Sequence, residues 1–587
     1  MIERFLKLFQ YFKKPSPTWV WLFSQQEYVG RFYGIVVVCM IITMLAEISF
    51  IWFTKLLVEY GFSNHTMLFV INSVLLITIL LRCASRGFMA LQVANYSQHL
   101  ITKVTLKAYN KSLRIPFSKL QAIGKSELVG KIQFQVSEIS LFFNTVLINA
   151  IQQILIIIGL IAAMLYLSWI LCIMTLLVMP VLFALMKMLK AKQTEYLHRM
   201  QDASASSQQL SIDAFSGIDN IKCHHAYDFI SRYYTQTMTC LKTQNIKTQR
   251  LSVLGKQVVE LFAMLPLVIF LYSIATGWLA ISLSTFVAII AAAARMRDPI
   301  GALSGLNLAF QRAMVSADKL YDFMMQPNEV GGTKPHDVFQ DLTLNNVSFK
   351  YPNQLINTLS NIHFTLKRGE KVLLLGRSGC GKSSLLKLIA GLYSPDGGDY
   401  VFNGHVFQDY SLLARSQAIS YATQHNKVFN MSLEDNITMG RSIDQDRFLR
   451  VCEQAALQDL IADFSNGSET LLGDGEQELS GGQQQRISIA RMLYANADIM
   501  LCDEITSALD VHTEQKVMHA LLEQHQEKTV VFVTHKISMV DRFDRIMVMH
   551  QGEIVADGSH HDLLLSNPYY QQLFIEYKDE QTHTTLH

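Results

Sequence analysis

The sequence has almost no excess of charge of either sign and no CxxC pair of cysteines. It contains 50 lysines and arginines against 48 aspartates and glutamates, and this net charge of +2 gives no reason to expect a nucleic-acid partner. It also lacks a CxxC pair or any other metal-ligand spacing, which argues against a disulfide framework or a structural zinc site. We expect reduced thiols that face the cytoplasm or the membrane, at positions 39, 83, 172, 223, 240, 380, 452 and 502.

The first 30 residues lack an apolar core, so we expect no cleavable signal peptide. Apolar sequence is abundant after them, because 50% of the 587 residues are hydrophobic, which is unusual for a soluble protein of this size. A membrane-spanning helix needs about 20 mostly apolar residues. We predict a helical membrane domain over residues 1–325 with six spans, at 32–54, 66–88, 144–166, 168–189, 258–279 and 283–305.

Basic residues collect in alternate connections between the predicted spans. They are frequent before the first span, between the second and third, and between the fourth and fifth, whereas the other connections contain only Lys55. This asymmetry predicts that both termini lie in the cytosol. The two long basic connections exceed what a turn requires, so we expect the flanking helices to continue into the cytosol as stalks. The stretch "WVWLF" (19–23) predicts an interfacial elbow before the first span.

The rest of the chain is typical of a soluble α/β domain. A polar linker at 326–340 is followed by a predicted domain at 341–576 and a tail at 577–587. Within it, "GRSGCGKSS" follows an apolar strand at 371–375 and matches a phosphate-binding loop that opens a helix. Backbone amides at such a helix start surround phosphates. We expect ATP to be bound by Gly376, Arg377, Ser378, Gly379, Cys380, Gly381, Lys382, Ser383 and Ser384, with Lys382 as a point charge and the Ser383 hydroxyl on Mg²⁺.

A second apolar strand, "ADIMLCDE" (497–504), ends in two acids well downstream of that loop. Alone, such a pair would be an ordinary surface feature at a strand end. In the same domain as a phosphate loop, Asp503 is placed to hold Mg²⁺ and Glu504 to polarise the attacking water. These two residues therefore predict nucleotide hydrolysis.

The stretch "LSGGQQQRISIARML" (479–493) resembles the signature of ATP-binding cassette (ABC) proteins. The resemblance covers residues 345–560, with several separated motifs in the expected order, so the domain is expected to have the ABC type of P-loop nucleotidase fold. It implies that Tyr351 stacks on adenine, that Gln424 contacts Mg²⁺ and senses the membrane domain, and that His535 contacts the γ-phosphate. The implied cofactors are ATP and Mg²⁺, and the implied activity is ATP hydrolysis.

The signature also implies a dimer. Its residues open a helix whose N-terminus offers donors to a γ-phosphate, and in this family that ATP is held by the other protomer. The loop "SALD", which ends at Asp510, communicates across the same interface. The residues expected to act in trans are Ser480, Gly481, Gly482, Gln483 and Asp510. One intact cassette per chain favours a homodimer, with a different partner left open.

Six spans followed by one cassette resemble the half-size ABC exporters, most of all bacterial lipid A flippases and multidrug exporters. The resemblance implies export or flipping of an amphipathic substrate across the inner membrane by alternating access. It also implies that residues 114–132 form a cytosolic coupling turn. A multidrug or small-peptide exporter would share these motifs, as would a membrane ATPase with a regulatory role.

Charges inside the predicted spans are the local indication of the cargo. Arginines at inner-leaflet depth could bind an anionic lipid or glycolipid such as lipid A-core, because guanidinium suits phosphate. The more ordinary interpretation is that they reach the interface or pair with acids such as Asp298. Depths counted along the spans argue against a direct pair between Glu47 and Arg82. The candidate cargo residues are Glu47, Arg82, Arg86, Arg295 and Arg297.

Overall fold

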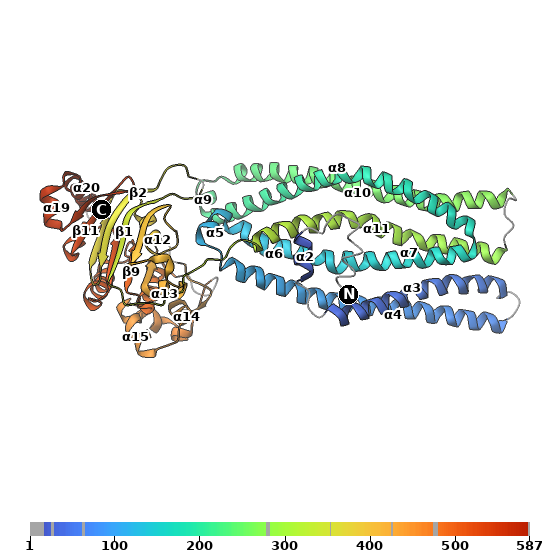
Figure 1. Cartoon of the computed structure of the whole chain (residues 1–587), viewed down its shortest axis with the longest axis horizontal. Helices are drawn as coiled ribbons and strands as arrows, with labels where there is room; N and C mark the ends of the chain where they lie inside the picture. Colours follow the sequence, from blue (N-terminus) through green and yellow to red (C-terminus); the bar gives the residue numbers. More distant parts are fainter. Residues whose placement is uncertain are drawn as a thin grey trace. The chain divides into compact units, whose positions relative to one another are not determined.

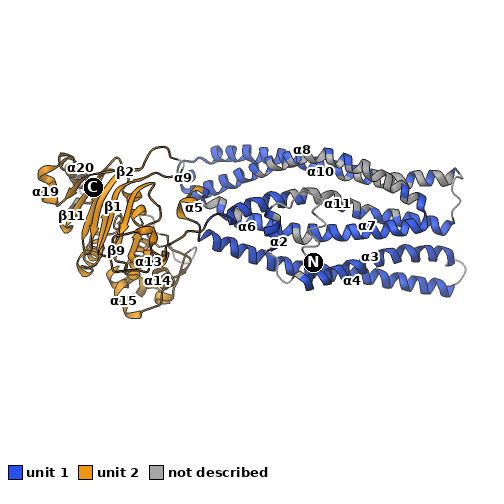
Figure 2. Ribbon diagram, in the orientation of Figure 1, with its two compact units in different colours: residues 1–115, 123–327 blue, residues 116–122, 328–587 orange. Residues whose placement is uncertain are grey.

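The computed structural model describes residues 17–24, 29–60, 65–276, 282–352, 354–423, 427–473 and 479–584. The chain divides into two compact units (Figure 2). The first contains residues 1–115 and 123–327, and the second contains residues 116–122 and 328–587. A short segment that is flanked on both sides by the first unit therefore belongs to the second.

The first unit is built of long helices in the part that the structure describes, and these run side by side (Figure 1). A π-helical turn at Phe142–Leu147 joins two of them without a break. The helices are α2 (Pro17–Ser24), α3 (Val29–Tyr60), α4 (His65–Ser112), α6 (Lys125–Leu141), α7 (Ile148–Leu167), α8 (Trp169–Ser216), α9 (Ile218–Cys223), α10 (Tyr227–Ala275) and α11 (Leu283–Met324).

Among the described residues, three stretches are long and apolar enough to cross a membrane, namely Gly30–Tyr60, His65–Ser112 and Ile148–Leu167. They contain or overlap the first three predicted spans. The predicted spans at 168–189, 258–279 and 283–305 fall within α8, α10 and α11, where many side chains lie outside the described part, and they stay predictions. The predicted stalks are helical: α4 alone has 48 residues, about 72 Å at 1.5 Å per residue.

Within the first unit, α3 contacts α4, α7 and α11, and α11 also contacts α6 and α10. Gly159 on α7 allows a close approach to α3, since a Cβ there would lie 2.8 Å from Cγ of Met44. The elbow predicted at 19–23 is part of the helix α2, which packs on α11. Its Thr18 hydroxyl donates to Asp318 at 2.7 Å, and the rings of Trp21 and Tyr321 meet edge to face.

The second unit contains two main sheets. The larger has the strand order β12-β11-β3-β10-β9-β6, parallel except for β12, and the smaller is antiparallel with the order β2-β1-β4-β5. The strands are β1 (Asp341–Phe349), β2 (Leu359–Lys367), β3 (Lys371–Leu375), β4 (Gly397–Phe402), β5 (His405–Val406), β6 (Ile419–Ala422), β7 (Met431–Ser432), β8 (Leu471–Leu472), β9 (Ile499–Asp503), β10 (Thr529–Val533), β11 (Arg545–His550) and β12 (Glu553–Gly558).

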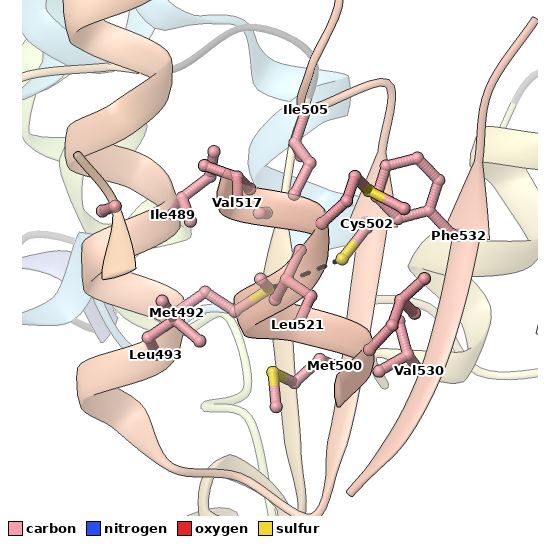
Figure 3. Close-up of a cluster of buried hydrophobic side chains, with 14 of the residues drawn as sticks. Ile489, Met492, Leu493, Met500, Cys502, Ile505, Val517, Leu521, Val530 and Phe532 are labelled. Atoms are coloured by element: carbon pink, nitrogen blue, oxygen red, sulfur yellow. Dashed lines mark hydrogen bonds between the residues drawn. The ribbon is translucent and has the colours of Figure 1, made fainter. Parts of the chain in front are cut away.

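Helices cover the larger sheet and hold its hydrophobic core. Figure 3 shows side chains of α17 and α18 packed against β9 and β10, with the sulfur atoms of Cys502 and Met492 3.8 Å apart. The cysteines of this core, like the others whose side chains are described, are free thiols in the structure. The helices of this unit are α5 (Phe117–Ile123), α12 (Lys382–Ile389), α13 (Leu412–Ala418), α14 (Leu433–Thr438), α15 (Gln445–Gln454), α16 (Gln458–Asp463), α17 (Gly481–Ala495), α18 (Val511–His519), α19 (His560–Ser566) and α20 (Pro568–Thr584).

Candidate functional site

Three parallel strands of the larger sheet end at the same edge. β10 pairs with both β3 and β9, so Val533 lies between Leu374 and Asp503 in the register. The carboxyl ends of adjacent parallel strands lie together and form the usual ligand-binding edge of an open α/β sheet. The phosphate loop after β3, the acids Asp503 and Glu504, and His535 after β10 are therefore brought together from three distant parts of the sequence.

The phosphate loop wraps around the Lys382 ammonium group. Its backbone is left-handed at Gly381, the N-cap of α12, and a Cβ at Gly376 would meet the Met549 carbonyl oxygen at 2.5 Å. The Lys382 Nζ donates to the carbonyl oxygens of Gly376 at 2.5 Å and Arg377 at 3.2 Å, and burial lowers its pKa. Both of these acceptors are neutral carbonyl oxygens, so a phosphate bound in the loop would supply the negative counter-charge for the buried ammonium group.

Asp503 is a buried carboxylate, 4% exposed, held by hydroxyl groups on both sides. Its Oδ1 accepts from Ser383 Oγ at 3.2 Å, and its Oδ2 accepts from the Tyr421 hydroxyl at 3.0 Å. Burial raises the pKa of Asp503, and a nearby cation would oppose that rise. Carboxylate and hydroxyl oxygens are the donor set that Mg²⁺ prefers. The sequence analysis did not identify Tyr421, which stands three residues before Gln424 and belongs to none of the motifs.

Glu504, the residue after Asp503, is in direct contact with His535. The His535 Nε2 lies 3.0 Å from Glu504 Oε1. Glu504 has a left-handed backbone with φ of 52°, uncommon for a residue with a side chain, and its amide donates to the Val533 carbonyl oxygen at 3.1 Å. Such backbone strain is tolerated where the surroundings impose it, often at functional sites. In this conformation the Glu504 carboxylate lies against the His535 ring.

The tyrosine predicted to stack on adenine lies beside the start of α12. The Tyr351 hydroxyl is 2.9 Å from Ser384 Oγ. The rings of Tyr351 and Tyr393 meet edge to face at 5.4 Å, and Tyr393 in turn contacts Phe117 at 5.5 Å. The Tyr393 hydroxyl also donates to the side chain of Gln121. The α5 segment of the predicted coupling turn therefore packs, within the second unit, against the aromatic group that borders the phosphate loop.

The signature residues begin α17 and contact the "SALD" loop. Ser480 and Gln483 form a reciprocal capping box, with Ser480 Oγ accepting from the Gln483 amide at 3.3 Å. The Gln485 side chain donates to Ser507 Oγ at 2.9 Å and accepts from the Ala508 amide at 3.0 Å. A Cβ at Gly482 would lie 2.9 Å from the Ala508 carbonyl oxygen, so glycine permits this close packing. Gln485 is a second residue that sequence reasoning missed.

The remaining predicted residues differ in what the structure says of them. Asp510 is the N-cap of α18, where its carboxylate accepts from the Thr513 amide at 3.0 Å. A side-chain hydrogen bond with Thr513, followed by this amide bond, lowers the pKa of Asp510. Arg377 points away from the loop to Glu576, with its Nη2 2.6 Å from Oε1. Gln424 lies outside the described residues.

Two stretches of the chain match known families. Residues 33–299 match the family described as ABC transporter transmembrane region, and residues 359–507 match the one described as ABC transporter. The chain belongs to the ABC transporter family. The transporter joins one membrane region to one cassette, the half-size exporter arrangement that the sequence predicts, and such an arrangement indicates dimerisation. It is a multi-pass membrane protein and an ATPase coupled to transport.

The transporter is similar to bacterial lipid flippases over nearly its whole length. It is 27% identical to the ATP-dependent lipid A-core flippase 2 of Colwellia psychrerythraea, over 94% of this chain and 96% of that protein. It is 28% identical to the ATP-dependent lipid A-core flippase of Methylobacillus flagellatus, over 93% of this chain and 95% of that one.

A solved structure of a bacterial Atm1-family ABC exporter with ATP bound has the same fold. It superposes with a TM-score of 0.83 at 19% identity, covering 94% of the transporter and 98% of that chain. The predicted fold class is therefore confirmed: a helical membrane domain is joined to an ABC-type α/β cassette.

The membrane unit of the transporter contains a buried charge cluster. Glu47 on α3 is 4% exposed, and three guanidinium groups surround its carboxylate. The nitrogen–oxygen distances are 2.8 Å for Arg82, 3.1 Å for Arg295 and 3.7 Å for Arg86. The Arg295 guanidinium also lies over the Phe50 ring at 4.4 Å, and the side chain of Arg297 lies outside the described part. The cluster has three positive charges and one negative charge.

The expectation that Glu47 and Arg82 do not pair is wrong. That expectation came from counting the depth of each residue separately, starting from the ends of the predicted span that contains the residue. Counted instead from Tyr60 and His65, where α3 and α4 approach each other, the two residues differ in height by about 6 Å. A long arginine side chain crosses that distance to reach a buried carboxylate, which would otherwise be unpaired at high cost.

Proposed function

We propose that this ABC transporter is a dimeric exporter or flippase that moves an anionic amphipathic lipid or glycolipid across the bacterial inner membrane. The proposed class of cargo rests on three arginines, Arg82, Arg86 and Arg295, which share the buried carboxylate of Glu47. The relatives named as lipid A-core flippases support the same class, with lipid A-core as the example. Both termini and the cassette lie in the cytosol in this proposal, in agreement with the basic connections.

Hydrolysis would use the residues gathered at the strand ends. Lys382 and the phosphate-loop amides bind the β- and γ-phosphates of ATP, and Tyr351 packs on adenine. Glu504 accepts a proton from the attacking water as general base, and His535, which contacts Glu504, holds the γ-phosphate side of the site. The direct contact between Glu504 and His535 at 3.0 Å supports their joint assignment.

Magnesium fits the oxygen atoms beside the phosphate loop. Ser383 and Asp503, whose side-chain oxygens are 3.2 Å apart, would hold it together with Gln424. When bound, Mg²⁺ neutralises charge on the β- and γ-phosphates of ATP. Tyr421 then orients Asp503 by its hydrogen bond to the second carboxylate oxygen.

A second copy of the chain would complete each nucleotide site. The start of α17 at Ser480, Gly481, Gly482 and Gln483 presents backbone donors that can bind the γ-phosphate held by the partner. Gln485 ties this helix start to the loop ending at Asp510, so the two in-trans segments move together. An isologous homodimer therefore has two identical sites.

Coupling would begin at the α5 segment. Phe117 and Gln121 on α5 contact Tyr393. Tyr393 contacts the ring of Tyr351, whose hydroxyl is hydrogen-bonded to Ser384 beside the phosphate loop. Because residues 116–122 are continuous with α4 and α6, a shift of these aromatic rings on ATP binding is transmitted to the membrane helices. Such a shift would open the membrane helices alternately toward one side of the membrane and then the other.

The charge cluster around Glu47 has a net positive charge, and it contains a buried hydrogen-bond donor that could bind a cargo group. Among the described residues, no acceptor contacts the buried Nε of Arg86. Each arginine shares Glu47 with the other two, so one carboxylate does not satisfy the donors of three guanidinium groups. A phosphate or carboxylate of the cargo would satisfy them and balance the charge. A neutral or cationic drug would not.

The proposal is tested by ATP hydrolysis of the purified protein in lipid nanodiscs, with Glu504→Gln as the blank. We expect anionic glycolipid to stimulate hydrolysis, whereas cationic drugs and short peptides do not. Arg82→Ala and Arg295→Ala should each raise the glycolipid concentration for half-maximal stimulation about tenfold, the loss expected for one charge-assisted hydrogen bond. Lys55→Ala, a basic residue on α3 outside the cluster, serves as the matched control and should retain stimulation.

Other outcomes would identify the alternatives. Stimulation by drugs or peptides alone contradicts the lipid assignment and favours a multidrug or peptide exporter. Hydrolysis without uphill movement of any cargo in sealed vesicles favours a regulatory membrane ATPase. Equal stimulation of the wild type, Arg82→Ala and Arg295→Ala by glycolipid would exclude the arginine cluster as the cargo site.

A further inference from the structure

The helix α20 at the end of the described chain is anchored beside the nucleotide site. Tyr570, Leu573 and Tyr577 recur at spacings of three and four, which places them on one helix face. They are 0%, 1% and 6% exposed and belong to the hydrophobic core of the cassette. The sequence boundary predicted at 577 thus divides a helix that continues to Thr584.

The Tyr577 hydroxyl connects two parts of the nucleotide site. It donates to the Gly376 carbonyl oxygen, the first residue of the phosphate loop, at 2.7 Å, and it lies 3.2 Å from His535 Nδ1. The two rings meet edge to face at 5.5 Å. A phenol has one proton, so a hydroxyl that donates to Gly376 accepts from Nδ1, and the imidazole is the donor at that nitrogen.

This bond fixes the direction in which the other ring nitrogen points. With Nδ1 held by Tyr577, Nε2 is directed at Glu504, 3.0 Å away. A histidine whose one nitrogen is held by a fixed partner has a defined ring orientation, so its other nitrogen points in a fixed direction. The neighbouring Glu576 adds a second tether, because it binds Arg377 of the phosphate loop through both carboxylate oxygens, at 2.6 Å and 3.3 Å.

We infer that Tyr577 is a positioning residue for ATP hydrolysis, through which α20 holds the phosphate loop and His535 in one fixed arrangement. The inference rests on the roles proposed above for Glu504 and His535. It adds that the turnover rate depends on the docking of a helix that lies outside the recognised cassette motifs. Displacement of α20 would release His535 and the Gly376 carbonyl oxygen together.

The same helix supplies a matched control. The Tyr570 hydroxyl lies 2.6 Å from Nδ1 of His560, so it makes the same kind of bond to a histidine. Its ring is as deeply buried as that of Tyr577, but His560 belongs to α19 and is not part of the nucleotide site. Tyr570→Phe and Tyr577→Phe therefore each remove a buried hydroxyl group that contacts a histidine, the first away from the nucleotide site and the second within it.

The experiment compares the kinetics of ATP hydrolysis by Tyr577→Phe, Tyr570→Phe and wild-type protein in nanodiscs. We expect Tyr577→Phe to lower kcat about tenfold, within the range of one hydrogen bond, while KM for ATP changes less than about threefold. Tyr570→Phe should change neither value. The melting temperatures of both variants should agree, which excludes a general loss of folding as the cause.

A double-mutant cycle with His535→Ala decides whether Tyr577 acts through the histidine. If it does, Tyr577→Phe has little further effect on kcat when His535 is absent. Additive losses, or a Tyr577→Phe variant as active as Tyr570→Phe, would overturn the inference. If Glu504→Gln abolishes hydrolysis in the same series, such a failure concerns Tyr577 alone. A Glu504→Gln variant with wild-type activity would instead overturn the proposed hydrolysis site and this inference with it.

Discussion

Replacing Glu504 by glutamine is expected to lower kcat for ATP hydrolysis about 10²- to 10⁴-fold, the contribution typical of a general base. The amide keeps the shape of the side chain and can still contact His535, but it cannot accept a proton from water at neutral pH. ATP binding should be retained, because Lys382 and the phosphate-loop amides are unchanged. The measurement is steady-state hydrolysis together with equilibrium binding of ATP.

Glu453→Gln is the matched control for this prediction. Glu453 is an exposed glutamate on α15 of the same cassette, and its substitution should leave hydrolysis unchanged. A Glu504→Gln variant that binds ATP and hydrolyses it at the wild-type rate would exclude Glu504 as the base. A variant that loses both binding and hydrolysis would indicate that Glu504 supports the fold of the site rather than the chemical step.

Replacing Glu47 by glutamine is expected to destabilise the membrane unit by about 3–5 kcal/mol, the usual cost of removing one partner from a buried ion pair. Its carboxylate is the shared counter-charge of Arg82, Arg86 and Arg295, so the substitution leaves three neighbouring positive charges that repel one another. The measurement is thermal or denaturant unfolding of the membrane unit in the full protein, in nanodiscs of fixed lipid composition.

Glu59→Gln, an exposed glutamate near the end of the same helix, provides the comparison. It should unfold like the wild type. If Glu47→Gln also unfolds like the wild type, the three arginines have solvent or lipid partners that replace Glu47. Added anionic glycolipid should restore part of the stability lost in Glu47→Gln, because its phosphate supplies the missing negative charge and ligand binding stabilises the folded state.

The proposed nucleotide site could be inferred from the sequence because each of its parts has a local signal. Lys382 stands in a glycine-rich loop between a strand and a helix, and Asp503 and Glu504 end an apolar strand. Their sequence neighbours alone indicate the chemistry, and the parallel register of β3, β10 and β9 then brings them together. Tyr421 and Gln485 have no such signal, since a single tyrosine or glutamine within a strand or helix has many ordinary roles.

The fold class, the ATP chemistry and the membrane character of this protein follow from short-range patterns of apolar, glycine and charged residues, which are visible in the sequence alone. Which distant side chains share a contact depends on the tertiary structure. It paired Glu47 with Arg82, which counting along each helix had separated, and it placed Tyr577 between Gly376 and His535. Such contacts depend on how helices and strands pack in three dimensions, and spacing along one chain does not contain that information.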